Sequence, residues 1–180
     1  LTRELLVKYD LSDNILIETT AYKGSVSDVL NRGTSTNGYN EIIDIEQEGL
    51  ENSFVFKDEN QKLTLSSTLS KSREGNGRPQ LRRPEKQFGI NYTKKIISNF
   101  FGPFDLKYDY RHIGKVEDWK NGSVRSKVDS SDIMNLSLSK KLSKQIWSLN
   151  IFNLTDEVYQ RPDTYNQERR RISLSFNHRY

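Results

Sequence analysis

The chain has 180 residues, a formal net charge of +4 and no cysteine; 33% of its residues are hydrophobic and 29% are charged. This composition, with a mean hydropathy of −0.80, argues against a large dry core, and the mild charge gives no support for a nucleic-acid partner. The lack of cysteine excludes disulfides and thiolate metal sites in these residues. No apolar run approaches the roughly 18 residues of a transmembrane helix.

Nine segments of the chain alternate apolar and polar residues, which predicts strands with one apolar and one polar face. In chain order they cover residues 1–11, 15–26, 41–57, 62–71, 88–92, 104–111, 134–138, 145–154 and 172–180. A bulge is predicted near Gly49, where the apolar phase slips. The longer segments suffice to cross a bilayer at a tilt, which takes about 9–11 residues.

The sixth segment shows the clearest alternation, because Phe104, Leu106, Tyr108 and Tyr110 are interleaved with charged residues. Aromatic residues on the apolar faces of such strands are typical of the interfacial girdles of a membrane barrel. The residues predicted for this role are Tyr108, Tyr110, Trp147, Phe176 and Tyr180.

The connections between the segments alternate short and long along the whole chain. Outer-membrane barrels show this asymmetry, with tight periplasmic turns and long extracellular loops. We therefore predict an all-β, antiparallel transmembrane β-barrel. Nine strands cannot close as an ordinary bacterial barrel, which has an even count. The expected structure is a fragment: one curved meander sheet of about nine long strands with two unpaired edges.

The end of the chain carries a resemblance to a known family. The stretch Asn153-Leu154-Thr155-Asp156-Glu157-Val158-Tyr159, a loop with Tyr165 and a closing strand ending in an aromatic residue resemble the C-terminus of TonB-dependent outer-membrane receptors. Thr155 stands where the family usually has Phe. Of the family's Pro-Gly-Arg before the last strand, only Arg169 is kept. Tyr39-Asn40 followed by Gly49-Leu50-Glu51, and Leu81-Arg82-Arg83-Pro84, resemble further receptor patterns, the latter that of cobalamin-type receptors.

The resemblance implies that residues 1–180 form the C-terminal part of a receptor barrel in the bacterial outer membrane. The plug domain, the TonB-contacting segment and a signal peptide would precede them. It further implies uptake of a scarce ligand, such as an iron–siderophore complex or cobalamin, energised by TonB. Implied partners are outer-membrane lipid, lipopolysaccharide and the barrel-assembly machinery, which would recognise the closing strand with Tyr180. No cofactor, nucleic acid or enzymatic activity is implied.

A basic segment between the fourth and fifth strands offers candidate ligand contacts. Arg73, Arg78, Arg82 and Arg83 lie within eleven residues at the expected extracellular rim, and arginine pairs bidentately with carboxylate and phosphate. Binding of lipopolysaccharide phosphates, or a merely solvated loop, would explain the same charges. Trp119 and Tyr165, in other long connections, are candidate stacking contacts.

Other chemistry finds little support in the residues. His112 and His178 are the only histidines, and they fall in phase with apolar faces without metal-ligand spacing. No serine lies in a nucleophile elbow, and the G-x-G at Gly75 precedes no helix. The alternatives are a passive porin or structural barrel, and a soluble β-sandwich lectin. A sandwich would bury its apolar faces between two sheets.

Overall fold

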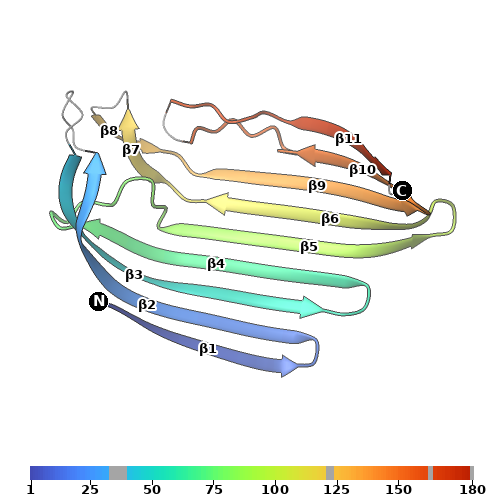
Figure 1. Ribbon diagram of the computed structural model, residues 1–180, viewed down its shortest axis with the longest axis horizontal. Coiled ribbons are helices and arrows are strands. Elements are labelled where there is room, and N and C mark those ends of the chain that lie inside the picture. Colours follow the sequence, from blue (N-terminus) through green and yellow to red (C-terminus); the bar gives the residue numbers. More distant parts are fainter. Residues whose placement is uncertain (33–39, 121–123, 162–163, 179–180) are drawn as a thin grey trace.

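The computed structural model describes residues 1–32, 40–120, 124–161 and 164–178, and that part of the chain contains strands and connections but no helix. Accordingly, the described residues include no helix able to span a membrane. Nine strands form one sheet in which all neighbours are antiparallel (Figure 1). In sheet order they are β1 (Thr2–Ser12), β2 (Ile15–Arg32), β3 (Asn40–Lys57), β4 (Gln61–Glu74), β5 (Lys86–Ser98), β6 (Gly102–Ile113), β9 (Ser131–Leu142), β10 (Gln145–Phe152) and β11 (Arg171–His178).

The remaining two strands, β7 (Val116–Lys120) and β8 (Val124–Val128), form a separate hairpin inserted between β6 and β9. The predicted sheet of nine strands is thus confirmed. Within the described residues, β1 pairs only with β2 and β11 only with β10, so both edges of the sheet are open.

The strand register gives the sheet two faces of opposite character. Directly opposed residues of antiparallel strands share a face. On the apolar face, one such row across the sheet consists of Tyr9, Ile17, Phe54, Leu65, Ile90, Tyr110 and Met134. On the polar face, the neighbouring row contains Thr64, Asn91, Asp109 and Asn135, and it continues through the apolar residues Val55 and Leu16 to Asp10. The period-two alternation therefore predicted the faces correctly.

Hydrogen bonds link side chains along the polar face. The Asn135 amide donates to Asp109 Oδ1 at 3.2 Å, and the Ser137 hydroxyl donates to Asn150 Oδ1 at 2.7 Å. These contacts satisfy polar groups that a dry core would leave without partners. The polar face therefore carries hydrogen-bonded polar side chains, which is what a face in contact with water requires.

Large side chains of the apolar face remain exposed. Leu174 is 70% and Phe176 52% accessible, whereas the buried apolar residues of the described chain are only Ile43, Ile45, Val116 and Val128. A β-sandwich would bury the apolar face beneath a second sheet, and the described strands supply only the small β7–β8 hairpin besides the main sheet. The sandwich alternative is therefore wrong, and the fold is a single two-faced sheet.

The short turns after β1, β3, β5 and β9 lie at one end of the sheet, and the ends of β2, β4, β6 and β10, which precede the longer connections, point to the other (Figure 1). The short turns are tight because side chains satisfy their backbone. In the β3–β4 turn, Asp58 accepts from the Gln61 side chain and from the backbone N–H groups of Asn60 and Gln61. These hydrogen bonds to the carboxylate, with the Gln61 side chain contributing most, hold the pKa of Asp58 below its usual value.

The predicted bulge near Gly49 is wrong. The β3 register runs unbroken through Gly49, which lies opposite Tyr22 on β2 and Ser70 on β4. A Cβ atom at Gly49 would lie 2.5 Å from the Tyr22 hydroxyl, so the glycine provides the space that the Tyr22 ring occupies. The irregularity of this region lies on β2 between Val26 and Val29, where Asp28 has a φ of 58°.

The long connection predicted between the segments 104–111 and 134–138 contains the β7–β8 hairpin. Its strands have five residues each, too few for their alternation to stand out among the charged residues around them. The strands predicted at residues 15–26 and 62–71 are longer than expected, because β2 continues to Arg32 and β4 to Glu74. Tyr39 and Tyr180, which were used in the sequence patterns, lie outside the described residues.

Candidate functional site

The β4–β5 connection and the β7–β8 hairpin meet at the long-connection end of the sheet. Three hydrogen bonds join them: the Arg82 backbone N–H donates to the Glu117 carbonyl, Arg82 Nε to Asp118 Oδ1, and an Arg125 nitrogen to the Pro79 carbonyl, at 2.8, 2.8 and 2.9 Å. We call the side chains that gather here the rim cluster. Its members are Glu74, Arg82, Glu117, Asp118, Trp119 and Arg125.

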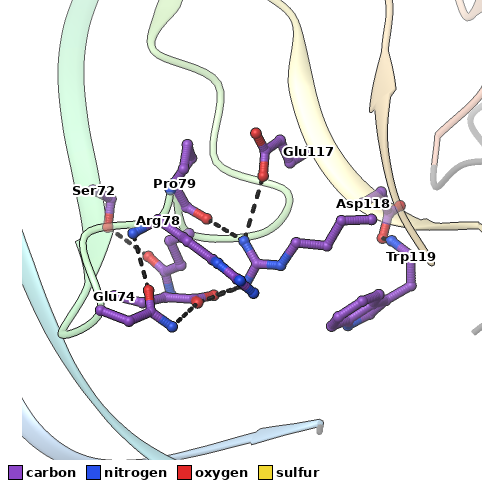
Figure 2. Close-up of polar contacts among 10 residues, drawn as sticks. Ser72, Glu74, Arg78, Pro79, Glu117, Asp118 and Trp119 are labelled. Atoms are coloured by element: carbon purple, nitrogen blue, oxygen red, sulfur yellow. Dashed lines mark hydrogen bonds and ion pairs between the residues drawn. The ribbon is translucent and has the colours of Figure 1, made fainter. Parts of the chain in front are cut away.

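Arg125 contacts more members of the rim cluster than any other of its residues; Figure 2 labels Glu74, Glu117 and Trp119, which surround it. Its guanidinium donates to both carboxylate oxygens of Glu74, and Glu117 Oε2 lies 3.4 Å from its other terminal nitrogen. The Glu74 side chain is 2% exposed and that of Arg125 17%. A buried ion pair does not by itself indicate high stability, but removing one partner leaves an uncompensated charge. The pair therefore ties the hairpin to the end of β4.

The aromatic ring of Trp119 lies beside the same guanidinium, with Arg125 Cζ 5.4 Å from the ring centre. Its backbone N–H donates to the fully buried carboxylate of Asp118, which also accepts from Arg82. The indole Nε1 of Trp119 and the Nε of Arg125 are buried and have no hydrogen-bond partner in the structure. Both donors are unsatisfied within the described residues, and because both atoms are buried, a ligand would reach them only if the rim cluster rearranged.

The β4–β5 connection has a defined internal structure. The Ser72 hydroxyl donates to Gln80 Oε1 at 2.6 Å, and the Glu74 N–H donates to the Arg78 carbonyl at 2.8 Å (Figure 2). Gly77, at the tip, has a φ of 81°, a conformation that favours glycine. The β4–β5 connection is thus held by its own hydrogen bonds, and it exposes the side chains of Arg78 and Arg83.

The structure assigns different surroundings to the four arginines predicted from the sequence. Arg73 pairs with Glu85 at 2.9 Å on the apolar face of the sheet, and Arg82 pairs with Asp118 in the rim cluster. Arg78 and Arg83 are exposed, and among the described residues neither side chain has an ion-pair partner. The sequence alone gave no sign that Arg125, 51 positions from Glu74, is the central cation.

The last long connection is held by the residues of the receptor-like motif. Asn153 is 4% exposed; its side chain accepts from the Glu157 N–H at 2.9 Å and donates to the Glu157 and Glu168 carbonyls. Asp156 accepts from Arg169 Nε at 2.9 Å and from the Arg170 backbone N–H. The bonds from Arg169 are the main reason why the pKa of Asp156 lies far below its usual value. The motif therefore folds this connection.

A second arginine fixes the tip of the same connection. Arg161 donates to the carbonyls of Ile113 and Gly114 at 3.2 and 3.0 Å, where β6 ends. Burial lowers the pKa of its guanidinium from the usual value. A Cβ atom at Gly114 would lie 2.8 Å from the Lys86 carbonyl, so only glycine fits there. Tyr165, the predicted stacking residue, is 65% exposed in this connection.

The predicted interface aromatics that the structure describes all lie on the apolar face. Tyr108 is opposed by Tyr92 and Leu136, and the Tyr110 hydroxyl donates to Asp132 Oδ1 at 2.7 Å. The rings of Trp147 and Phe176 are 4.8 Å apart. Their depth in a membrane stays a prediction. The described residues contain no group of three or more side chains able to hold a metal ion.

Comparisons with known proteins place the fold. No protein-family model matches the chain, and no curated protein matches its sequence. Solved structures do match. The ferric-catecholate import receptor Fiu of E. coli K12 gives a TM-score of 0.75 at 16% identity, over 98% of this chain and 27% of the receptor.

Two further receptors give similar values. The ferripyoverdine receptor of the Pseudomonas aeruginosa outer membrane gives a TM-score of 0.77 at 14% identity, over 97% of this chain and 26% of the receptor. The ferric yersiniabactin uptake receptor FyuA of Yersinia pestis gives 0.74 at 14% identity, over 98% and 27%. These similar structures are uptake receptors and not enzymes. The fold is that of a segment of a TonB-dependent receptor barrel, and the chain spans about a quarter of those receptors' length.

Proposed function

We propose that these residues are the C-terminal part of an outer-membrane receptor that imports a scarce ligand, an iron–siderophore complex or cobalamin, with energy supplied through TonB. The observation that carries this proposal is the two-faced meander, which matches import receptors over nearly its whole length. The apolar face would contact lipid and the polar face would line the lumen. Uptake of iron chelates by the similar receptors favours a ferric siderophore over cobalamin.

The position of the connections supports one orientation in the membrane. Outer-membrane barrels have short turns on the periplasmic side and long loops outside. The rim cluster and the connection that contains Tyr165 would then face the exterior. Lipopolysaccharide would surround this end, and the barrel-assembly machinery would insert the barrel by way of its closing strand.

Three side chains are the proposed ligand contacts. Arg78 and Arg83 are exposed and have no ion pair among the described residues, and the side chain of Trp119 is partly exposed although its Nε1 is buried. Guanidinium groups suit the carboxylate and other anionic oxygens of siderophores. Arg73 and Arg82 are already paired, so their contribution to ligand binding would be smaller.

Growth under iron limitation tests the proposal. The full-length protein is expressed in a Gram-negative host without its own ferric-siderophore receptors, and growth is measured on a ferric catecholate, a ferric hydroxamate and, in a cobalamin-requiring host, cobalamin. We expect at least one ligand to support growth only when TonB is present. Entry of small solutes regardless of TonB would instead identify the passive porin alternative.

Substitutions separate specific contacts from general charge. Arg78→Ala with Arg83→Ala is expected to lower uptake at limiting ligand about tenfold, which corresponds to the loss of one or two charge-assisted hydrogen bonds. Lys141→Ala with Lys144→Ala removes the same charge at the short-turn end and serves as the matched control. Equal uptake by both double variants would contradict the assigned contacts.

A further inference from the structure

The apolar face changes character along the first four strands. Its last apolar row toward the long connections consists of Leu5, Ala21, Leu50 and Leu69. Two residues further along each strand, the same face carries Arg3, Lys23, Glu48 and Lys71, again directly opposed. The following row adds Glu46 opposite Arg73. The charged rows therefore border directly on one apolar row. On its other side that apolar row is followed by Thr19, Asn52 and Ser67, which are hydrogen-bonded to one another, and then by the row that contains Ile17, Phe54 and Leu65.

A groove of about 570 Å³ lies over these charged rows. Its charged lining residues are Arg3, Lys23, Glu46, Glu48, Lys71 and Arg73. We call it the cationic groove, because four cations line it against two carboxylates. On the side toward the short turns, the groove borders the apolar row Leu5, Ala21, Leu50 and Leu69. An amphipathic molecule could therefore place its charged group in the groove and an apolar group on this row.

The groove retains free positive charge. Lys23 pairs with Glu48 at 3.3 Å and Arg73 with Glu85 at 2.9 Å, and all four side chains are more than a third exposed. Such exposed pairs are weak, so their cations remain able to take another anion. Arg3 and Lys71 have no hydrogen-bond or ion-pair partner for their side chains among the described residues.

We propose that the cationic groove binds the phosphate groups of lipopolysaccharide, with the lipid's acyl chains lying on the apolar rows below. Arg3 and Arg73 supply planar forks suited to phosphate, and Lys23 and Lys71 supply point charges. The charged rows lie toward the long connections, hence on the outer side, where lipopolysaccharide forms the leaflet. The inference rests on the proposed function for this orientation, and it assigns residues to a lipid contact that was expected only in general terms.

Binding to the purified full-length protein tests the groove. Native mass spectrometry in detergent micelles would compare lipid A, lipid A without its phosphates, and phosphatidylglycerol. We expect lipid A to bind best and the dephosphorylated form to lose most binding. Arg3→Glu with Lys71→Glu is expected to weaken lipid A binding by about tenfold or more, because two phosphate contacts become repulsive. Lys141→Glu with Lys144→Glu, an equal charge change at the other end, should leave it unchanged.

The outcomes that overturn the inference are specific. Equal lipid A binding by the wild type and by the R3E/K71E variant would show that the cationic groove is not the binding site. Phosphatidylglycerol binding as well as lipid A, or displacement of lipid A by millimolar inorganic phosphate, would show a general phosphate preference instead. The binding assay contains no transported ligand and no TonB. A protein that binds lipid A through the groove but imports nothing would therefore refute the import function alone.

Discussion

The nine-stranded sheet and the rim cluster are held together by contacts of different kinds. In the sheet, most ladders join strands that follow one another in the chain, and opposed residues repeat with a period of two. In the rim cluster, Arg125 and Glu74 are 51 positions apart, and Arg82 and Asp118 are 36 apart. The sheet is thus specified by a repeated pattern, and the rim by single residues. Substitutions should reveal that difference.

The largest effect is expected from Arg125→Ala. It leaves the Glu74 carboxylate buried without its partner, a change that costs about 3–5 kcal/mol in the free energy of local unfolding. The loss should be confined to the long-connection end. Hydrogen exchange would show faster exchange for the β7–β8 amides and unchanged exchange for those of β5 and β6.

The double variant Glu74→Gln with Arg125→Ala refines this prediction. If the unpaired carboxylate causes most of the loss, the second substitution should recover part of it. An equal loss in the single and double variants would show that the packing of Arg125 on Trp119, and not its charge, holds the hairpin.

Gly49→Leu should disturb the sheet itself. A Cβ atom there meets the Tyr22 ring at 2.5–2.6 Å and the Leu69 carbonyl at 2.9 Å, and overpacking of this kind costs about 1–3 kcal/mol. Urea unfolding from lipid vesicles would measure the loss. Glu51→Leu, on the same face of β3 at an exposed position, is the size control. Adding Tyr22→Ala should restore part of the stability; no restoration would mean that the backbone contact dominates.

Acid should loosen the last long connection through Asp156. Because its pKa is lowered by folding, its ion pair contributes fully above the ordinary carboxyl value of 3.8 and progressively less as the pH falls below it. Amide exchange of residues 153–159 is expected to rise at low pH in the wild type. In Asp156→Asn it should be faster already at neutral pH and depend less on acid. Identical acid profiles for the two proteins would contradict this role.

The smallest effect is expected from Lys115→Ala. Lys115 pairs with Asp129 at 3.0 Å, but both side chains are largely exposed, at 67% and 88%. Such a surface pair contributes about 0–1 kcal/mol. Its removal beside the hairpin provides a baseline for Arg125→Ala in the same exchange experiment, and a comparable loss would mean that burial is not what separates the two pairs.

The same contrast explains how far the sequence could be interpreted. Alternation at positions such as 104–111 was enough to predict the strands, their faces and the open sheet, because a period of two is a local property. Asn153, Asp156 and Arg169 were noticed in the sequence only because they resemble a receptor motif. The structure shows that their side chains form the hydrogen bonds that fold the last long connection. The bond between Arg125 and Glu74 has no local signature. Likewise, the space that Gly49 leaves for Tyr22 depends on strand pairing. The slip of phase near Gly49 has another cause: Ile43 and Ile45 are buried on the face of β3 opposite to that of Leu50.

The meander also bears on how the sheet assembles. Every ladder but one joins consecutive strands across a turn or a single connection, so each pairing closes a modest stretch of chain. The exception, β6 with β9, encloses the β7–β8 hairpin, which forms its own ladder in the gap and shortens the stretch that remains to be ordered. Low contact order of this kind favours stepwise addition of hairpins. The growing sheet would then always offer one free edge as the template for the next strand.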